Sequence, residues 1–175
     1  MKRTPRSFAS LFLSIPLVCA SVALAAAPLQ PVPFVKEVAQ INLLEIALGK
    51  VAQTNSTNAE VKEFGLYMTK SHTQINAMLK SSAAQQGITV PKSLNGSSKA
   101  TLSKLSGLQG KAFDTTYIPA MVKGHTEVLA MLKQFSATTS DPVLKAFAQK
   151  ITPIIAMHLH HAKMVLADLK KDGEL

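Results

Sequence analysis

Four stretches of this 175-residue sequence place apolar residues at the three- and four-residue spacing of an amphipathic helix. They span residues 34–54, 58–86, 108–136 and 141–170. No stretch alternates apolar and polar residues strictly enough to predict a β-strand. The pattern therefore predicts an all-α protein in which four amphipathic helices form a bundle.

Residues that start and stop helices lie between these stretches. Thr57 and Glu60 have the spacing of a capping box, which predicts Thr57 as the N-cap of the second helix. Gly87 is placed to end that helix. Asp141 followed by Pro142 predicts an N-cap and a first-turn proline for the fourth helix.

The connections between the helices are short, long and short. Residues 88–107 are rich in Ser, Gly and Lys, and they predict a long link with a short helix at 98–105. This spacing fits either a simple up-down bundle or a ferritin-like bundle with a crossover between the second and third helices. Pro119 and Pro153 fall inside predicted helices and should kink or open them locally.

One ionisable residue interrupts the apolar stripe of each helix: Glu45, His72, His125 and His158. Such groups are costly to bury unless they are paired, hydrogen-bonded or bound to a metal ion. A rise of about 1.5 Å per residue places all four near the middle of the bundle. Three imidazoles and a carboxylate form a donor set for zinc, copper or iron, and His161 could add or exchange a ligand.

A structural interpretation of the same residues stays open. A core histidine is more often a hydrogen-bonded residue than a metal ligand, and Asn76 or water could complete a polar network. The sequence has no Glu-x-x-His motif for the usual di-iron site, and no nucleophile-elbow, zinc-protease or phosphate-loop motif. We therefore expect a binding or structural protein, with an oxidoreductase that uses a single iron or copper ion as a weaker alternative.

The methionines give a weaker signal. Thioethers can bind copper(I), but these residues are scattered over several helices, so we expect them to fill the core. They are Met68, Met78, Met121, Met131, Met157 and Met164.

Residues 1–25 have the features of a secretory signal peptide. Basic residues precede an apolar run, and Ala23-Leu24-Ala25 is a small-residue cleavage site. Pro16 and several serines make the run a poor membrane span. We expect cleavage to release a periplasmic or secreted domain, residues 26–175, without stable membrane insertion.

Cleavage would also change the composition of the protein. It would remove Cys19, the only cysteine, and with it any disulfide, thiol nucleophile or cysteine-ligated metal site. It would remove both arginines and lower the net charge from +9 to +6. Nucleic-acid interfaces rely on arginine and stacked aromatic residues, and this chain has no Trp. Nucleic acid is therefore not an expected partner.

Several blocks of residues, spread over most of the chain, carry a resemblance to a known family. They are Phe34-Val35, Glu45-Ile46-Ala47-Leu48-Gly49-Lys50, Glu60-Val61-Lys62-Glu63-Phe64, Met68, His72, Phe113-Asp114-Thr115-Thr116-Tyr117, Met121-Val122, His125, Leu144-Lys145-Ala146-Phe147-Ala148, Pro153 and His158. Taken in order, these blocks resemble the Domain of Unknown Function 4142 family. This family contains exported bacterial proteins that are often labelled outer-membrane proteins and placed with ferritin-like bundles. The resemblance implies a ferritin-like four-helix bundle with a long second connection, and export, but no established activity. Asp commonly precedes the histidines of the second and third helices in this family, whereas Ser71 and Gly124 stand there in this chain.

These observations predict an exported bundle that binds a divalent metal ion at a mid-bundle Glu/His site. The alternative is a non-enzymatic structural or envelope-stress interaction module, in which the core Glu and His residues form only a hydrogen-bonded network.

Overall fold

The computed structural model describes residues 29–173, which fold into five α-helices without a strand in that range. The helices are α1 (Pro31–Asn55), α2 (Ala59–Gln85), α3 (Gly96–Ser106), α4 (Gly110–Thr138) and α5 (Pro142–Lys171). The all-α bundle prediction is confirmed, and the four long helices begin and end within three residues of the predicted bounds. The predicted signal peptide lies outside the described residues.

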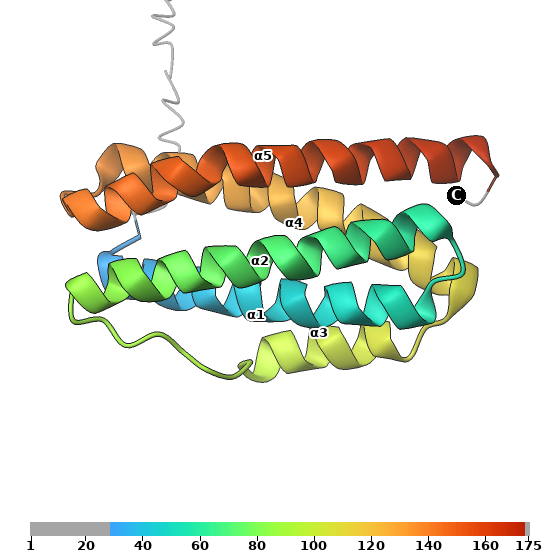
Figure 1. Cartoon of the computed structure of the whole chain (residues 1–175), viewed down its shortest axis with the longest axis horizontal. Coiled ribbons are helices and arrows are strands. Elements are labelled where there is room, and N and C mark those ends of the chain that lie inside the picture. The colour runs from blue at the N-terminus through green and yellow to red at the C-terminus, as the bar shows by residue number, and fades with distance from the viewer. Residues whose placement is uncertain (1–28, 174–175) are drawn as a thin grey trace, which may run out of the picture.

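The long connection crosses the length of the bundle (Figure 1). α1 and α2 form one antiparallel pair, and α4 and α5 form the other. The link between the pairs carries α3, which packs along α1. As a result α2 and α4 run in the same direction, which is the crossover connectivity of ferritin-like bundles and not the simple up-down arrangement.

The caps of α2 and α5 use short acidic or amide side chains. Asp141 accepts hydrogen bonds from two first-turn amides of α5, as predicted. The predicted cap of α2 was wrong by one residue. Asn58, not Thr57, is the N-cap, and its Oδ1 accepts from the backbone N–H groups of Glu60 and Val61. An Asn side chain caps at least as well as Thr, so the adjacent residue takes the position.

The end of α2 has the geometry predicted for Gly87. This glycine has a φ of 65°, in the left-handed region that favours glycine. The backbone N–H of Ile88 donates to the carbonyl of Ala83 at 2.9 Å, which closes a Schellman motif. The two internal prolines, by contrast, do not interrupt their helices, because α4 continues through Pro119 and α5 continues through Pro153.

Two apolar clusters fill the two halves of the bundle, with a polar layer between them. In each long helix, the residues of the polar layer fall between residues of the first and second clusters. The polar layer consists of Asn42, Glu45, Ser71, His72, His125 and His158, all buried. The first cluster is Phe34, Val35, Val38, Ala39, Ile75, Leu79, Ala83, Leu132, Phe135, Leu144, Phe147, Ala148, Ile151 and Ile155. The second is Leu48, Ala52, Val61, Phe64, Met68, Leu105, Phe113, Tyr117, Ile118, Met121, Ala162, Val165 and Leu169.

Two glycines allow α1 and α2 to approach each other closely. A Cβ on Gly49 would lie 2.5 Å from the carbonyl oxygen of Gly65 and 2.6 Å from Oγ1 of Thr69. A Cβ on Gly65 would lie 2.7 Å from the carbonyl oxygen of Gly49. These distances are shorter than real Cβ contacts, so the pairing of the two helices depends on the missing side chains. Within residues 29–173, no helix combines the length and hydrophobicity needed to span a bilayer.

We predict opposite effects of alanine at two helical glycines. Gly49→Ala should lower the free energy of unfolding by about 1–3 kcal/mol, because the new methyl group meets backbone atoms of α2. Gly124→Ala should raise it by up to about 1 kcal/mol, because a Cβ there meets no atom within 4 Å and alanine favours the helix. Urea unfolding of the two variants measures both effects. Equal effects would contradict the close approach of α1 and α2.

Candidate metal centre

Three of the predicted ligands converge in the polar layer. His72 from α2, His125 from α4 and His158 from α5 are all buried. One candidate ligand atom from each lies within 4.8 Å of those from the other two. Their ring centroids are 5.0 to 5.8 Å apart. The apolar stripes of three helices therefore bring three imidazoles to one point, as expected for stripes that all face the bundle axis.

Hydrogen bonds to carbonyl oxygens fix the tautomers of two of these rings. Nδ1 of His72 lies 2.9 Å from Oδ1 of Asn42, and Nδ1 of His125 lies 2.8 Å from the carbonyl oxygen of Met121. A carbonyl oxygen can only accept, so both Nδ1 atoms carry the proton and donate. The Nε2 atoms therefore keep their lone pairs, and neither has a hydrogen-bond partner among the described residues.

The third ring is held by a hydroxyl group. Nε2 of His158 lies 2.7 Å from Oγ of Ser71, and Nδ1 of His158 has no partner in the described part of the chain. Ser71 contacts His158 across the bundle and not the adjacent His72, because consecutive residues of a helix point apart. Each of the three histidines thus uses one ring nitrogen for orientation and leaves the other free.

Burial keeps the three imidazoles neutral. Desolvation lowers the pKa of His72 well below its usual 6.5, and the charged forms of His158 and His125 would lower it further. Desolvation also lowers the pKa of His125, against a hydrogen bond to Met121 that raises it. The pKa of His158 falls to about 3, through desolvation and then its neighbours His125 and His161. Neutral imidazole is the form that binds metal ions.

Glu45 lies beside the three histidines, but its carboxylate is not part of the group of converging ligand atoms. Its side chain is 7 % exposed, its Oε2 has no hydrogen-bond partner, and it makes no ion pair with a histidine within residues 29–173. Desolvation raises its pKa to about 8. The same carboxyl contributes to a raised pKa of the buried Tyr117, after the larger effect of burial.

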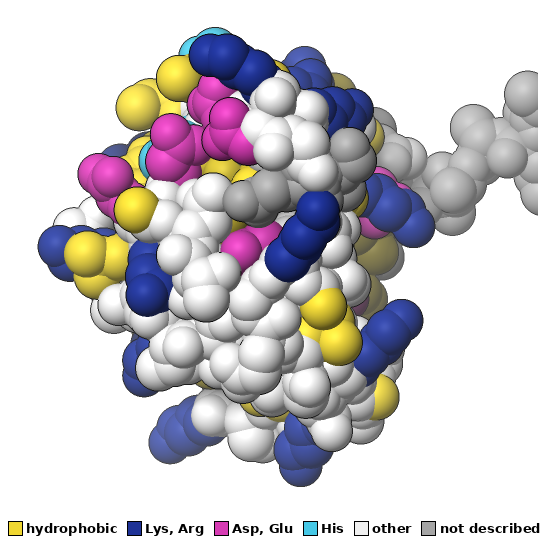
Figure 2. Space-filling model, turned by 90° about the vertical axis from the view of Figure 1, so that its right-hand side faces the viewer, with side chains coloured by type: hydrophobic (Ala, Val, Ile, Leu, Met, Phe, Trp, Pro, Cys, Tyr) yellow, Lys and Arg dark blue, Asp and Glu magenta, His cyan; other side chains and the backbone are white. Residues whose placement is uncertain are grey.

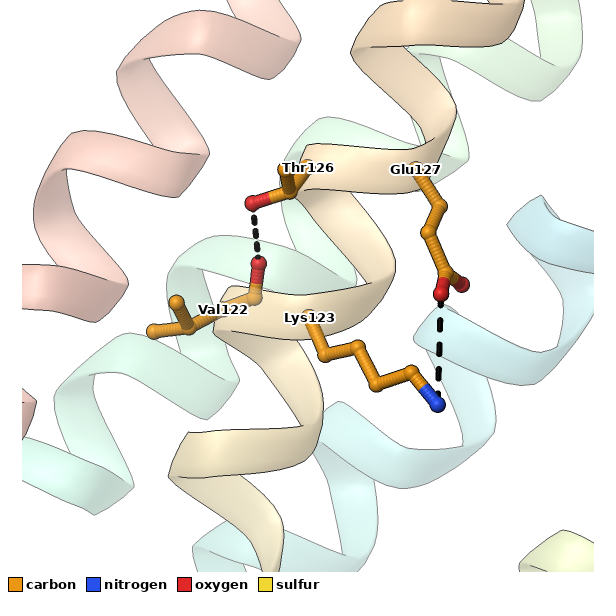
Figure 3. A network of polar contacts seen from close by, with 4 residues as sticks. All are labelled: Val122, Lys123, Thr126 and Glu127. Atoms are coloured by element: carbon orange, nitrogen blue, oxygen red, sulfur yellow. Dashed lines mark hydrogen bonds and ion pairs between the residues drawn. The ribbon is translucent and has the colours of Figure 1, made fainter. Parts of the chain in front are cut away.

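A cavity of about 330 Å³ connects Glu45 to two of the histidines. Glu45, His72 and His125 line it together with Gly124 and apolar residues of α1, α4 and α5. The exposed Glu37 and Glu127 also line it, so it reaches the surface between α1 and α4. Figure 3 shows Lys123 reaching toward Glu127 on this side of α4, at 3.9 Å. Two acidic side chains, Glu37 and Glu127, thus lie at the opening, with Lys123 beside Glu127.

His161 lies outside the converging group. It is half-buried on α5, with its ring 5.2 Å from that of Phe64 and 5.6 Å from that of Tyr67. His160 is exposed. The fifth predicted ligand therefore packs against α2 and does not join the three converging histidines.

Sequence reasoning missed two residues that support the histidines. Asn42 precedes Glu45 by one helical turn, so a polar residue at that position of the stripe was a signal that could have been used. Ser71 offered no comparable signal, because its contact depends on how α2 packs against α5.

Comparison with known proteins identifies a family but no function. A family model described as "Domain of unknown function (DUF4142)" matches residues 19–165. No curated protein and no solved structure matches the chain.

The buried groups predict how the stability of the metal-free protein depends on pH. Below about pH 6.5 the unfolded histidines take up protons that the folded ones do not, so unfolding becomes easier as the pH falls. Each group contributes up to about 1.4 kcal/mol per pH unit. Glu45 has the opposite sign between about pH 4.5 and 8, because its folded form keeps a proton that the unfolded form loses.

Stability should therefore be greatest near pH 6.5 and fall on both sides, more steeply toward acid, because three groups act there against one. Urea unfolding across this range measures the profile. Glu45→Gln should remove the decline above pH 6.5, and His160→Asn should keep the wild-type profile. A flat profile on the acid side would mean that the three imidazoles are not buried as described.

Proposed function

The chain belongs to the DUF4142 family, whose function is unknown, and we propose from the geometry of its core that it binds a divalent transition metal ion. His72, His125 and His158 are the proposed ligands. The observation that carries this proposal is the combination of three neutral imidazoles, each oriented by another group, whose remaining nitrogens are buried without partners. A buried polar atom without a partner costs stability. An ion that binds Nε2 of His72 and Nε2 of His125 offsets that cost, and it also binds Nδ1 of His158 in the tautomer whose Nε2 donates to Ser71.

The contacts behind the histidines support the proposal. Histidines that bind metal ions usually donate their other N–H to a carbonyl or carboxylate, which fixes the ring and its tautomer. Asn42 and the Met121 carbonyl do this for His72 and His125. Bonds of about 2.0 Å to a tetrahedral ion would place the ligating nitrogens roughly 3.3 Å apart, so small inward rotations of the rings are needed.

Three imidazoles leave a further coordination position open, which suits zinc, copper or iron. The cavity lined by Glu45 gives this position a route to the surface. Glu37 at its opening carries charge of the sign that attracts cations, whereas the charge of Glu127 is partly offset by Lys123.

The competing function is a purely structural polar network. It is favoured by the hydrogen bond that each ring already makes. The two functions differ in what His125→Leu does. In a structural network, leucine of similar size leaves the protein as stable or more stable. In a metal site, it removes a gain in stability that appears only when the ion is present.

We predict that metal-free protein binds one equivalent of zinc through the three histidines. At free zinc about 100-fold above Kd, the wild type should gain about 2.7 kcal/mol in unfolding free energy. His125→Leu should lose most of this gain, whereas His160→Leu, on the exposed side of α5, should keep it. Calorimetric titration and urea unfolding with and without zinc measure binding and stability. Absence of stoichiometric binding, or an equal gain in His125→Leu, would contradict the proposal.

We also propose that the protein is exported and that residues 1–25 are removed, on the basis of the signal-peptide pattern of those residues. The expected mature protein begins at Ala26. Mass spectrometry of protein recovered from the periplasm or the medium measures its N-terminus. Recovery of the full-length chain from the cytoplasm alone would contradict export.

A further inference from the structure

A second set of metal-binding atoms lies on the outer side of α5. Met157, His160, His161 and Met164 follow one another at spacings of three, one and three residues. In a helix, residues at positions i, i+3, i+4 and i+7 share one face. The four side chains therefore form a single stripe, which is rotated by about 110° around α5 from the proposed core ligand His158.

The two methionines of this stripe do not fill the core. Met157 is 63 % exposed and Met164 is 51 % exposed. Met68 and Met121, by contrast, are buried in the second apolar cluster, as predicted for the methionines in general. The prediction of core filling was therefore wrong for Met157 and Met164, because the neighbouring helices leave these two positions of α5 largely uncovered.

All four side chains of the stripe line one shallow cavity of about 430 Å³, together with Tyr67 and Glu63 of α2. A smaller adjoining cavity, of about 210 Å³, is lined by His161, Met164 and three acidic residues of α2 and α5. Figure 2 shows acidic side chains gathered on one side of this end of the bundle, whereas lysines are spread around the rest. The local charge thus favours a cation on a chain of net positive charge.

The ring of His161 is held in place by aromatic neighbours. It lies edge-on to Phe64, with centroids 5.2 Å apart and an interplanar angle of 81°. It is tilted against Tyr67 at 5.6 Å. These contacts orient the ring, and neither of its nitrogens has a hydrogen-bond partner among the described residues. His161 thus offers an oriented imidazole beside two solvent-accessible thioethers.

We propose that Met157, His160, His161 and Met164 form a copper(I) site on the surface of α5. Thioether sulfur is a soft ligand that selects copper(I), whereas zinc prefers imidazole, thiolate and carboxylate. Each methionine has a histidine three and four residues away, at the spacing at which helical side chains meet. A sulfur, an imidazole and a second sulfur can thus approach one ion, and Glu63 adds negative charge beside it.

This site uses none of the proposed core ligands. The stripe shares no residue with the His72, His125 and His158 group, although the ring of Tyr67 lies between the two groups and contacts both His158 and His161, at 5.2 and 5.6 Å. The two proposals can therefore fail separately. Zinc titration with His125→Leu tests the core, and a soft monovalent ion with methionine variants tests the surface.

The test uses protein labelled with ¹³C at the methionine methyl groups and titrated with silver(I), a redox-stable substitute for copper(I). The methyl signals of Met157 and Met164 should shift on binding, and those of Met68 and Met121 should not. His125→Leu should give the same shifts as the wild type. Unchanged Met157 and Met164 signals at saturating silver would overturn the proposal.

Affinity for copper(I) itself is measured anaerobically by competition with a chromogenic chelator. The double variant Met157→Leu/Met164→Leu keeps side-chain size at two exposed positions and should fold normally. Its affinity for copper(I) should fall by at least about tenfold, because loss of a contact that only supports a ligand already costs about that much in metal affinity. The matched control Met78→Leu/Met131→Leu, in half-buried positions elsewhere, should keep wild-type affinity. Equal affinity of the two double variants would overturn the proposal.

Discussion

The structure depends on keeping three imidazoles neutral and oriented between two apolar clusters. Apolar residues at these positions would join the clusters into one continuous core. Instead the bundle places His72, His125 and His158 there and surrounds them with the partners needed to hold each ring. Burial alone favours their neutral forms, and the hydrogen bonds of His72 and His125 select which nitrogen carries the proton. One candidate ligand atom of each histidine lies within 4.8 Å of those of the other two.

The fold could be predicted from the sequence because each long helix carries its own complete signal. These signals are local: the apolar stripes, the N-cap at Asp141 and the C-terminal glycine Gly87. The helix bounds predicted from them lie within three residues of the observed bounds. The direction of the long connection is not local. It depends on how the two helix pairs pack, so the spacing alone allowed two topologies.

The candidate site, like the fold, could be predicted as far as local features of each helix determine it. A helical stripe fixes which side of a helix a residue faces, so the convergence of three histidines followed from their positions in three stripes. It does not fix how far along the bundle a side chain reaches or which group it contacts. Glu45 therefore lies beside the group and not within it, and the contact of Ser71 with His158 could not be predicted.

α5 shows why the spacing of apolar residues alone does not predict whether a methionine is buried or exposed. The helix buries His158, leaves His161 half-buried and carries exposed methionines at positions 157 and 164. A methionine stripe and a core stripe have the same spacing, so only the packing of the neighbouring helix distinguishes them. α2 covers one side of α5 and leaves Met157 exposed. The helix therefore presents one imidazole, that of His158, to the interior, and it presents imidazoles together with thioethers on its more exposed side. The two sides should therefore differ in the metal ions they prefer, since thioether ligands favour softer ions than imidazole alone.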